Sequence, residues 1–314
     1  MFKHICFYHY HVNGDCWSTR LIVQHIIENT KHFNLEYYYT AERSINSHCE
    51  DIGIPSNHFN IIGPPGDNKD NLYINDTIFI NVWVGFCDLS TFCVFCLKIL
   101  DKRYNDLISD INNHTHYNIP LIDTTIKEKY TMSNIIPFNY DFYKFDFLKT
   151  YIESKRQTYK KVILLMNVFV TTKILLNNIN HNEYINFISS KYPDYLFITF
   201  IKVNTNNTNL LSISDIFNEM NIPNPNSYGI QYSFLSTLCD KNILLNTGPG
   251  LFCFNNENRF SKNKILFIDS DDYCPQCSQS QVLCLDKCEL HANYYKYNMN
   301  NTDFLHTVQN FITL

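Results

Sequence analysis

Glycine is scarce in this chain, at 8 of 314 residues. Asparagine, isoleucine, tyrosine and lysine are abundant instead, a bias that resembles the amino-acid usage of very AT-rich genomes. Because glycine lets a backbone adopt a positive φ or approach a ligand closely, each glycine that remains carries more weight than usual. Tight turns and close approaches are therefore expected first at Gly14, Gly85, Gly248 and Gly250.

An excess of positive charge is also missing. The formal net charge is -5, and lysine and arginine form no basic cluster along the chain. Because proteins bind nucleic acid largely through lysine and arginine contacts to phosphates, this composition argues against a nucleic-acid partner. A content of 45% hydrophobic and 15% aromatic residues is ample for buried cores, and the length predicts two globular domains.

The chain has no long uninterrupted apolar run. Residues 1–12 carry polar histidines where a signal peptide has its apolar core, so we expect no secretion by that route. Residues 78–100 are the most apolar stretch, but Asp88 lies at its middle, which favours a buried strand and a core helix over a membrane span. Most of the 12 cysteines stand singly in apolar segments, which fits a reducing cytoplasm better than a disulfide framework.

Strand and helix patterns alternate through the first half of the chain. Apolar and β-rich runs predict strands at 5–8, 35–40 and 77–84, and amphipathic stretches predict helices at 17–29 and 91–110. This alternation is typical of an α/β domain of the Rossmann-like kind, which we assign to residues 1–154. The pattern loosens between 112 and 158, apart from a possible helix at 143–154, so the domain boundary is expected near Lys155.

The second half restarts the same plan. Strands are predicted at 162–166, 195–201, 242–245 and 264–268, with helices at 174–191 and 228–239 and another that begins near Leu251. Residues 155–314 therefore form a second Rossmann-like domain in this interpretation. The predicted fold class is α/β, with two Rossmann-like domains that face a cleft.

The loop after the first strand holds the first group of candidate residues. Open α/β sheets bind ligands at the carboxyl ends of their strands, so Asn13, Gly14 and Asp15 are expected at a ligand site. Gly14 permits a tight turn, and the Asp15 carboxylate can take a proton from a hydroxyl nucleophile, or it can simply cap the following helix. His9 and His11 would lie on one side of an extended strand, where His11 could line the same cleft.

Two asparagines occupy corresponding positions in the two halves. Asn81 lies at the end of a predicted strand in the first half, and Asn167 directly follows one in the second half. Either side chain could contact a ligand at the strand's carboxyl end, or could cap a loop.

A glycine-containing turn in the second half holds another group, Asn246, Thr247, Gly248 and Gly250, with Pro249 between the two glycines. The turn lies between a predicted strand and a predicted helix, where backbone N–H groups can approach an anionic ligand. It matches neither a Walker loop nor the dinucleotide-binding fingerprint, and a plain glycine turn is the alternative.

Taken together, the Gly14-Asp15 pair after the first strand and the Asn246-Thr247-Gly248-Pro249 turn resemble GT-B glycosyltransferases. Within that fold, the chain is most similar to the heptosyltransferase-like group, glycosyltransferase family nine. The segment 238–240 before the turn's strand also resembles that family, and the resemblance in architecture spans residues 2–268.

The resemblance implies an activity and assigns roles to residues. It implies transfer of a sugar from a nucleotide-sugar donor to a hydroxyl acceptor, without a catalytic metal. Asp15 would be the base toward the acceptor, and the turn at 246–250 would bind the donor diphosphate. Lys173 stands about where such enzymes often have a basic residue near the phosphates.

One departure from the family motivates a second hypothesis. The family usually has a histidine soon after the Gly-Pro pair, where this chain has Gly250, Leu251 and Phe252. A catalytically inactive GT-B-like binding or scaffold protein, with a zinc loop as a structural element, is therefore the alternative function.

Cysteines cluster near the end of the chain. Cys274 and Cys277 form a C-x-x-C pair, and Cys284 and Cys288 form a C-x-x-x-C pair, with His291 as an alternative fourth ligand. Four thiolates can complete a closed tetrahedral zinc site, which would support folding rather than catalysis. A disulfide or free thiols are the other possibilities.

Overall fold

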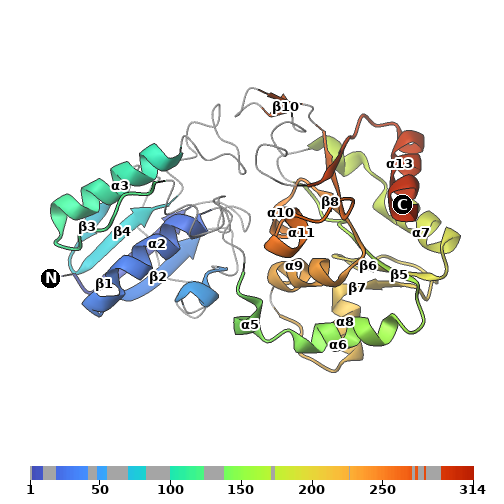
Figure 1. The fold of residues 1–314 in the computed structure, drawn as a ribbon, viewed down its shortest axis with the longest axis horizontal. Helices are drawn as coiled ribbons and strands as arrows, with labels where there is room; N and C mark the ends of the chain where they lie inside the picture. Colours follow the sequence, from blue (N-terminus) through green and yellow to red (C-terminus); the bar gives the residue numbers. More distant parts are fainter. Residues whose placement is uncertain are drawn as a thin grey trace. The chain divides into compact units, whose positions relative to one another are not determined.

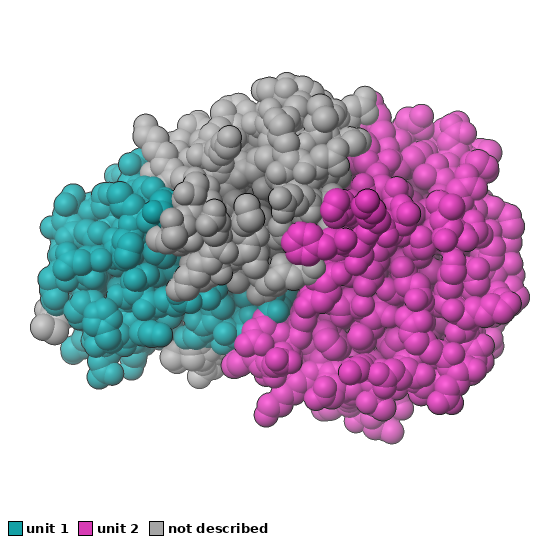
Figure 2. Space-filling model, in the orientation of Figure 1, with its two compact units in different colours: residues 1–138, 274–279 teal, residues 139–273, 280–314 magenta. Residues whose placement is uncertain are grey.

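The structure is a computed structural model in which the chain forms two compact units. It describes residues 2–9, 19–41, 48–54, 70–82, 100–123, 138–170, 174–225, 227–270, 273–274, 279–280 and 291–314. Unit 1 comprises residues 1–138 and 274–279, and unit 2 comprises residues 139–273 and 280–314 (Figure 2). Both units are mixed α/β structures built on sheets that are mostly parallel (Figure 1).

Unit 1 contains a four-stranded sheet in the order β2-β1-β4-β3. The central strand β1 pairs in parallel with β2 on one side and with β4 on the other, whereas β3 pairs antiparallel with β4. The elements are β1 (His4–His9), α2 (Arg20–Thr30), η1 (Lys31–Phe33), β2 (Glu36–Ala41), η2 (Glu50–Ile52), β3 (Leu72–Ile74), β4 (Thr77–Asn81) and α3 (Leu100–His114).

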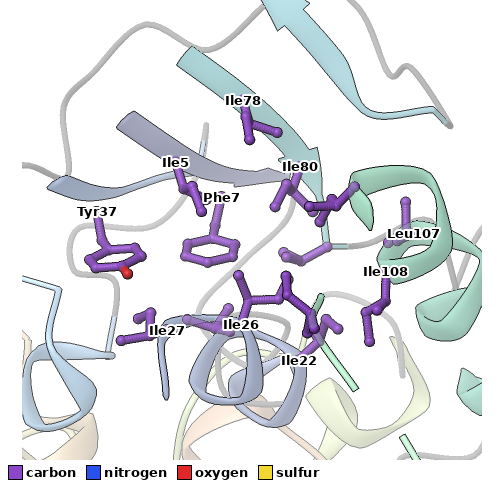
Figure 3. Close-up of a cluster of buried hydrophobic side chains, with 14 of the residues drawn as sticks. Ile5, Phe7, Ile22, Ile26, Ile27, Tyr37, Ile78, Ile80, Leu107 and Ile108 are labelled. Carbon is purple, nitrogen blue, oxygen red and sulfur yellow. The ribbon is translucent and has the colours of Figure 1, made fainter. Parts of the chain in front are cut away.

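The core of unit 1 lies between this sheet and its helices (Figure 3). Alternate residues Ile5 and Phe7 of β1 share one face of the strand, and both are fully buried. They join Ile22 and Ile26, which lie four residues apart on α2 and therefore on one face of that helix. The helix is thus held on the sheet by its apolar stripe.

A buried ion pair fixes the start of α2. Arg20 is fully buried, and its two terminal nitrogens donate to the carboxylate oxygens of Asp51 at 2.8 and 2.7 Å. Arg20 also donates to the backbone carbonyl of His48, and its guanidinium carbon lies 4.6 Å from the centre of the Phe138 ring. The bidentate geometry compensates for removing both charges from water, so the 48–54 segment is anchored to α2.

Unit 2 contains a six-stranded sheet in the order β12-β9-β8-β5-β6-β7, in which all neighbouring strands are parallel. Counted along the chain and read from β7, the strand order is 3-2-1-4-5-6, which is the dinucleotide-binding Rossmann order. The strands are β5 (Lys161–Leu165), β6 (Tyr195–Thr199), β7 (Leu210–Ser212), β8 (Lys241–Leu245), β9 (Ile265–Asp269) and β12 (Asn293–Lys296).

The helices of unit 2 connect and cover these strands. They are α5 (Tyr140–Tyr143), α6 (Asp146–Lys155), η6 (Ile174–Asn178), α7 (His181–Lys191), α8 (Ile213–Glu219), α9 (Gly229–Leu238), α10 (Gly248–Phe252), α11 (Asn256–Arg259) and α13 (Asn301–Thr313). Two short strands, β10 (Tyr273–Cys274) and β11 (Gln279–Ser280), pair with each other.

Within the described ranges, no helix combines the length and apolar character that a bilayer crossing needs.

The division between the units lies at residues 138 and 139, whereas the sequence suggested a boundary near Lys155. The difference concerns α6, which belongs to unit 2. The Tyr151 hydroxyl donates to Glu219 of α8 at 2.7 Å, and Arg156, which directly follows α6, pairs with Asp240 at 3.0 Å. These contacts tie the apparently loose segment to the second sheet.

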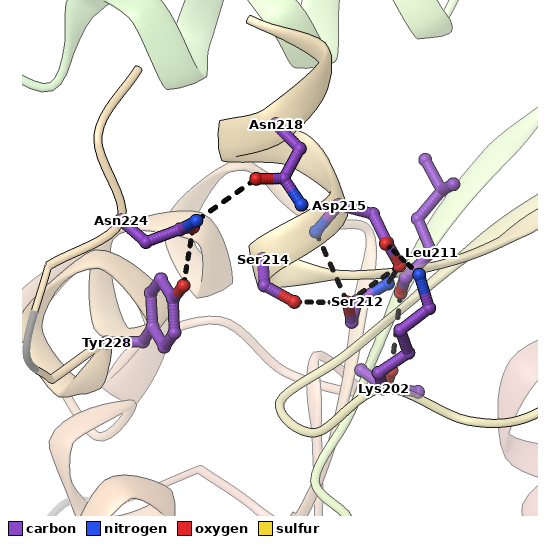
Figure 4. A network of polar contacts seen from close by, with 9 residues as sticks. Lys202, Leu211, Ser212, Ser214, Asp215, Asn218, Asn224 and Tyr228 are labelled. Atoms are coloured by element: carbon purple, nitrogen blue, oxygen red, sulfur yellow. Dashed lines mark hydrogen bonds and ion pairs between the residues drawn. The ribbon is translucent and has the colours of Figure 1, made fainter. Parts of the chain in front are cut away.

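A polar network at the carboxyl ends of β6 and β7 starts α8 (Figure 4). The Ser212 hydroxyl accepts from the Asp215 backbone N–H at 3.3 Å, and the Asp215 carboxylate accepts from the Ser212 N–H at 2.9 Å. This reciprocal capping box satisfies two donors of the helix start. Lys202 adds an ion pair to Asp215 at 2.6 Å.

The burial of His48 leads to a pH prediction. Burial and the nearby Arg20 charge lower the pKa of His48 to about 3, against 6.5 in the unfolded chain. Between these values the unfolded state binds the extra proton, so unfolding becomes easier as the pH falls. We expect this residue alone to lower the unfolding free energy by about 2 kcal/mol between pH 8 and pH 5.

Urea denaturation at the two pH values, followed by circular dichroism, measures this effect. His48→Asn should remove that part of the pH dependence, because asparagine does not titrate and tolerates the positive φ of 53° at this position. His32→Asn, at an exposed histidine of the same unit, is the matched control and should keep it. An unchanged pH dependence in His48→Asn would contradict the assignment.

Candidate functional site

The strongest candidate site is at the carboxyl ends of β5 and β8 in unit 2. From β5 the chain proceeds to β6 and β7 on one side, then returns to β8 on the other side of β5. In open α/β sheets, ligands bind outside the carboxyl ends at such a reversal of strand order. Leu165 is paired with Ile243, so residues 166–170 and 246–250 follow neighbouring strands at the same end of the sheet.

Asn246 joins the ends of two strands. Its backbone N–H donates to the Ile268 carbonyl at 3.0 Å, and its side-chain amide donates to the Asp269 carboxylate at 2.8 Å. Asp269, the last residue of β9, is fully buried and also accepts from the Ser270 N–H at 2.7 Å. The Asn246 amide is thus committed to holding the turn in place.

Thr247 caps the short helix α10. Its hydroxyl accepts from the Gly250 N–H at 3.0 Å, while its own N–H donates to the Leu245 carbonyl at 2.7 Å. The Leu251 N–H donates to the Thr247 carbonyl at 2.9 Å, and Pro249 has no N–H. Of the turn's N–H groups, only that of Gly248 has no acceptor among the described residues.

The turn therefore offers fewer donors than its sequence suggested. A ligand could receive a bond from the Gly248 N–H and from the hydroxyl hydrogen of Thr247, since a hydroxyl that accepts one bond can still donate another. The remaining backbone donors hold the turn itself. The helix-capping and ligand-binding interpretations are thus compatible, because the two roles use different atoms of the turn.

Gly250 is required for close approach, not for a positive φ. A Cβ at this position would lie 2.1 Å from the Leu245 carbonyl oxygen and 3.0 Å from the Thr247 hydroxyl. Neither a backbone oxygen nor a capping hydroxyl can move away without breaking the turn. Only glycine therefore fits between the end of β8 and the start of α10.

A buried polar network behind the turn holds α9, α10 and α11 together. The Asn255 amide donates to the Ser233 carbonyl at 3.1 Å, and the Asn258 amide donates to the Ser236 hydroxyl at 2.6 Å. Ser233 also donates to the Phe252 carbonyl at the end of α10. The sequence analysis did not single out these residues, although Ser233 and Ser236, three residues apart and so on one face of helix α9, are a signal for such a network.

Asn167 makes a two-way bond to the neighbouring loop. Its amide donates to the Ile201 carbonyl at 2.8 Å, and its side-chain oxygen accepts from the Ile201 N–H at 2.8 Å. Asn167 is buried, with 8% of its surface exposed. Its described contacts are those of a loop clamp at the ends of β5 and β6.

In unit 1 the order of strands also reverses, at β1. Asn81 is fully buried at the carboxyl end of β4, and is paired with Tyr8 of β1. The chain leaves β1 at His9 and re-enters described structure at Thr19, whose hydroxyl is 2.8 Å from the Tyr39 hydroxyl. The strand expected at the start of the chain and the helix expected after it are confirmed by β1 and α2, whereas the segment between them lies outside the described residues.

Several candidate residues lie outside the described residues. They are His11, Asn13, Gly14, Asp15, Gly85, Lys173 and three of the clustered cysteines, Cys277, Cys284 and Cys288. Cys274 is described only as a residue of β10.

Four described cysteines are buried thiols that belong to no disulfide: Cys6, Cys49, Cys239 and Cys253. Burial raises the pKa of Cys6 and of Cys239 to about 12, and also raises that of Cys253. Because the thiolate is the reactive form, these groups are poor nucleophiles. Across the described ranges, no three histidine, cysteine or acidic side chains gather as a metal site.

Comparisons with known proteins establish no family. No family model matches this sequence. No curated protein matches it either. Among solved structures, a match is found to the crystal structure of the glycosyl transferase family 9 from Veillonella parvula, with 9% sequence identity and a TM-score of 0.37. The match covers 98% of this chain and 89% of that chain.

The packing at Gly250 gives a stability prediction. Gly250→Ala should lower the unfolding free energy by about 1–3 kcal/mol, because the added methyl group would overlap the Leu245 carbonyl. Glu257→Ala, at an exposed residue of α11, is the control and should stay within about 0.5 kcal/mol of the wild type. Urea denaturation measures both, and wild-type stability in Gly250→Ala would refute the described packing.

Proposed function

We propose that this chain is a GT-B-like glycosyltransferase, which transfers a sugar from a nucleotide-sugar donor to a hydroxyl acceptor. The observation that carries the proposal is the position of the 246–250 turn. This turn, which resembles the diphosphate-binding turn of glycosyltransferase family nine, lies at the reversal of a sheet with Rossmann strand order. A sequence resemblance and an independent topological rule thus indicate the same place.

The proposed donor site is in unit 2. The Thr247 hydroxyl and the Gly248 N–H would donate to the diphosphate, and Lys173 would supply positive charge. Asn246 and Gly250 would hold the turn in position through the contacts described above, and Asn167 would hold the neighbouring segment after β5. Donors that are fixed before the reaction stabilise a leaving diphosphate without reorganising.

The proposed acceptor side is in unit 1, in the segment that follows β1 along the chain. Asp15 would take the proton of the acceptor hydroxyl as its oxygen attacks the anomeric carbon of the sugar. The bond from that carbon to the diphosphate oxygen would break, and the diphosphate would leave with the electron pair.

A binding protein without transfer activity is the second candidate, and the turn itself favours it. The N–H groups of Thr247, Gly250 and Leu251 are already bonded within unit 2. Leu251 and Phe252, which occupy the place of the family's histidine, are buried apolar residues. Such a turn could hold a nucleotide without activating it.

Transfer assays separate the two candidates. We expect that, for at least one nucleobase, the nucleotide sugars that carry it raise the melting temperature of the wild type and yield a glycosylated acceptor. Asp15→Asn should lower kcat by about 100-fold to 10,000-fold while leaving the thermal shift unchanged, since only proton removal is lost. Asp106→Asn, at an exposed aspartate of α3, is the control and should keep full activity.

The results have distinct meanings. No thermal shift with any donor would overturn the donor site, and therefore the proposal. A shift without transfer in the wild type would favour the binding protein. Full activity in Asp15→Asn would refute the assignment of the base.

A structural zinc in the cysteine cluster is a separate proposal, supported by donor chemistry. Four thiolates from Cys274, Cys277, Cys284 and Cys288 match the ligand set of closed zinc sites. We expect about one zinc per chain in atomic emission measurements of the purified protein. Cys284→Ser combined with Cys288→Ser should lose the metal, whereas Cys239→Ser should retain it, and a zinc-free wild type would refute the site.

A further inference from the structure

An exposed aromatic side chain stands at the reversal of strand order in unit 2. Phe169 follows β5 by four residues, and 73% of its surface is exposed. Exposed phenylalanine is unfavourable in water, and an isolated case on a surface has no special meaning. Here, however, the residue occupies the end of the sheet where ligands of this fold bind.

The backbone around Phe169 is fixed by two asparagines. Asn167 exchanges two bonds with Ile201, as described above. Asn177 does the same with Val170: its side-chain oxygen accepts from the Val170 N–H at 2.8 Å, and its amide donates to the Val170 carbonyl at 2.9 Å. Phe169 is therefore held between two clamps, and its exposure does not arise from a loose loop.

Two further exposed apolar side chains lie on the clamped segments. Ile201, the partner of Asn167, is 49% exposed, and Ile174, at the start of η6, is 75% exposed. Both residues belong to segments that the two clamps join to the Phe169 loop. Phe169, Ile174 and Ile201, which we call the apolar rim, thus lie at the same end of the sheet as the polar turn.

The strand register relates the apolar rim to the turn at 246–250. Leu165 of β5 is paired with Ile243 of β8. Phe169 lies four residues beyond the first, and Thr247 lies four residues beyond the second. Adjacent strands are about 4.8 Å apart, so the segment that carries Phe169 and the polar turn follow neighbouring strands of the sheet.

We propose that Phe169 stacks on the nucleobase of the donor nucleotide. The inference rests on the proposed function, because it assumes a nucleotide at this site. A base presents a planar π face, on which aromatic side chains stack with little preference among bases. The polar turn of β8 would then hold the diphosphate, and the rim after β5 would hold the base.

Calorimetric titration of the full-length protein with UDP, GDP, ADP and CDP tests the proposal, with inorganic diphosphate as the probe without a base. Phe169→Ala should weaken binding of the preferred nucleotide by about 10-fold to 100-fold. Its affinity for inorganic diphosphate should not change. Phe169→Tyr should restore nucleotide binding, and Phe187→Ala, at an exposed phenylalanine of α7, is the matched control.

A spectroscopic readout identifies stacking directly. The base protons of the bound nucleotide should move upfield in proton NMR with the wild type and Phe169→Tyr, through the ring current, but not with Phe169→Ala. If the wild type binds the nucleotide and Phe169→Ala binds it equally well, stacking is refuted while the donor site stands. If the wild type binds no nucleoside diphosphate, the proposed function fails and stacking fails with it.

Sedimentation velocity tests a different occupant of the rim. If the wild type self-associates and Phe169→Ala does not, the exposed ring contacts a second copy of the chain, and the stacking proposal is overturned. Identical sedimentation of the two proteins, together with the loss of nucleotide affinity, supports it.

Discussion

The parallel pairing of β5 with β6 on one side and β8 on the other is the constraint on which unit 2 depends. It places β5 at the centre of the sheet, and the two loops that follow β5 and β8 leave neighbouring strands where the order of strands reverses. One loop is held by asparagine clamps and carries an exposed aromatic ring, and the other is a capped glycine turn. The order of strands thus brings together segments that are about 80 residues apart in the sequence.

The bounds of the central strands could be predicted closely from the sequence, because buried parallel strands are short continuous apolar runs. The run at 162–166 became β5 (Lys161–Leu165). The single helix expected at 174–191 is interrupted, since Asn180 caps α7 by accepting from the Glu183 N–H at 3.2 Å. The strand β7 was missed because it has three residues, although the Ser212 and Asp215 spacing that starts α8 is a capping signal.

The sequence located the glycine turn but not its chemistry. Which N–H groups are bonded internally depends on how closely α10 approaches Leu245, and that approach is set by packing between elements. Local patterns likewise contain no information on the pairing of β5 with β8, because the contact joins distant segments. Neither the order of the strands nor the donor atoms of the turn could therefore be predicted from the sequence, because both depend on contacts between distant segments.

The scarcity of glycine has a thermodynamic consequence. Eight described residues other than glycine have a positive φ, and five of them are asparagine: Asn34, Asn75, Asn118, Asn221 and Asn263. Asparagine tolerates this conformation better than most residues do. In the unfolded state, however, an asparagine samples fewer backbone conformations than a glycine does. Each such turn therefore loses less conformational entropy on folding than a glycine turn would, and part of the stability of this protein originates in its denatured state.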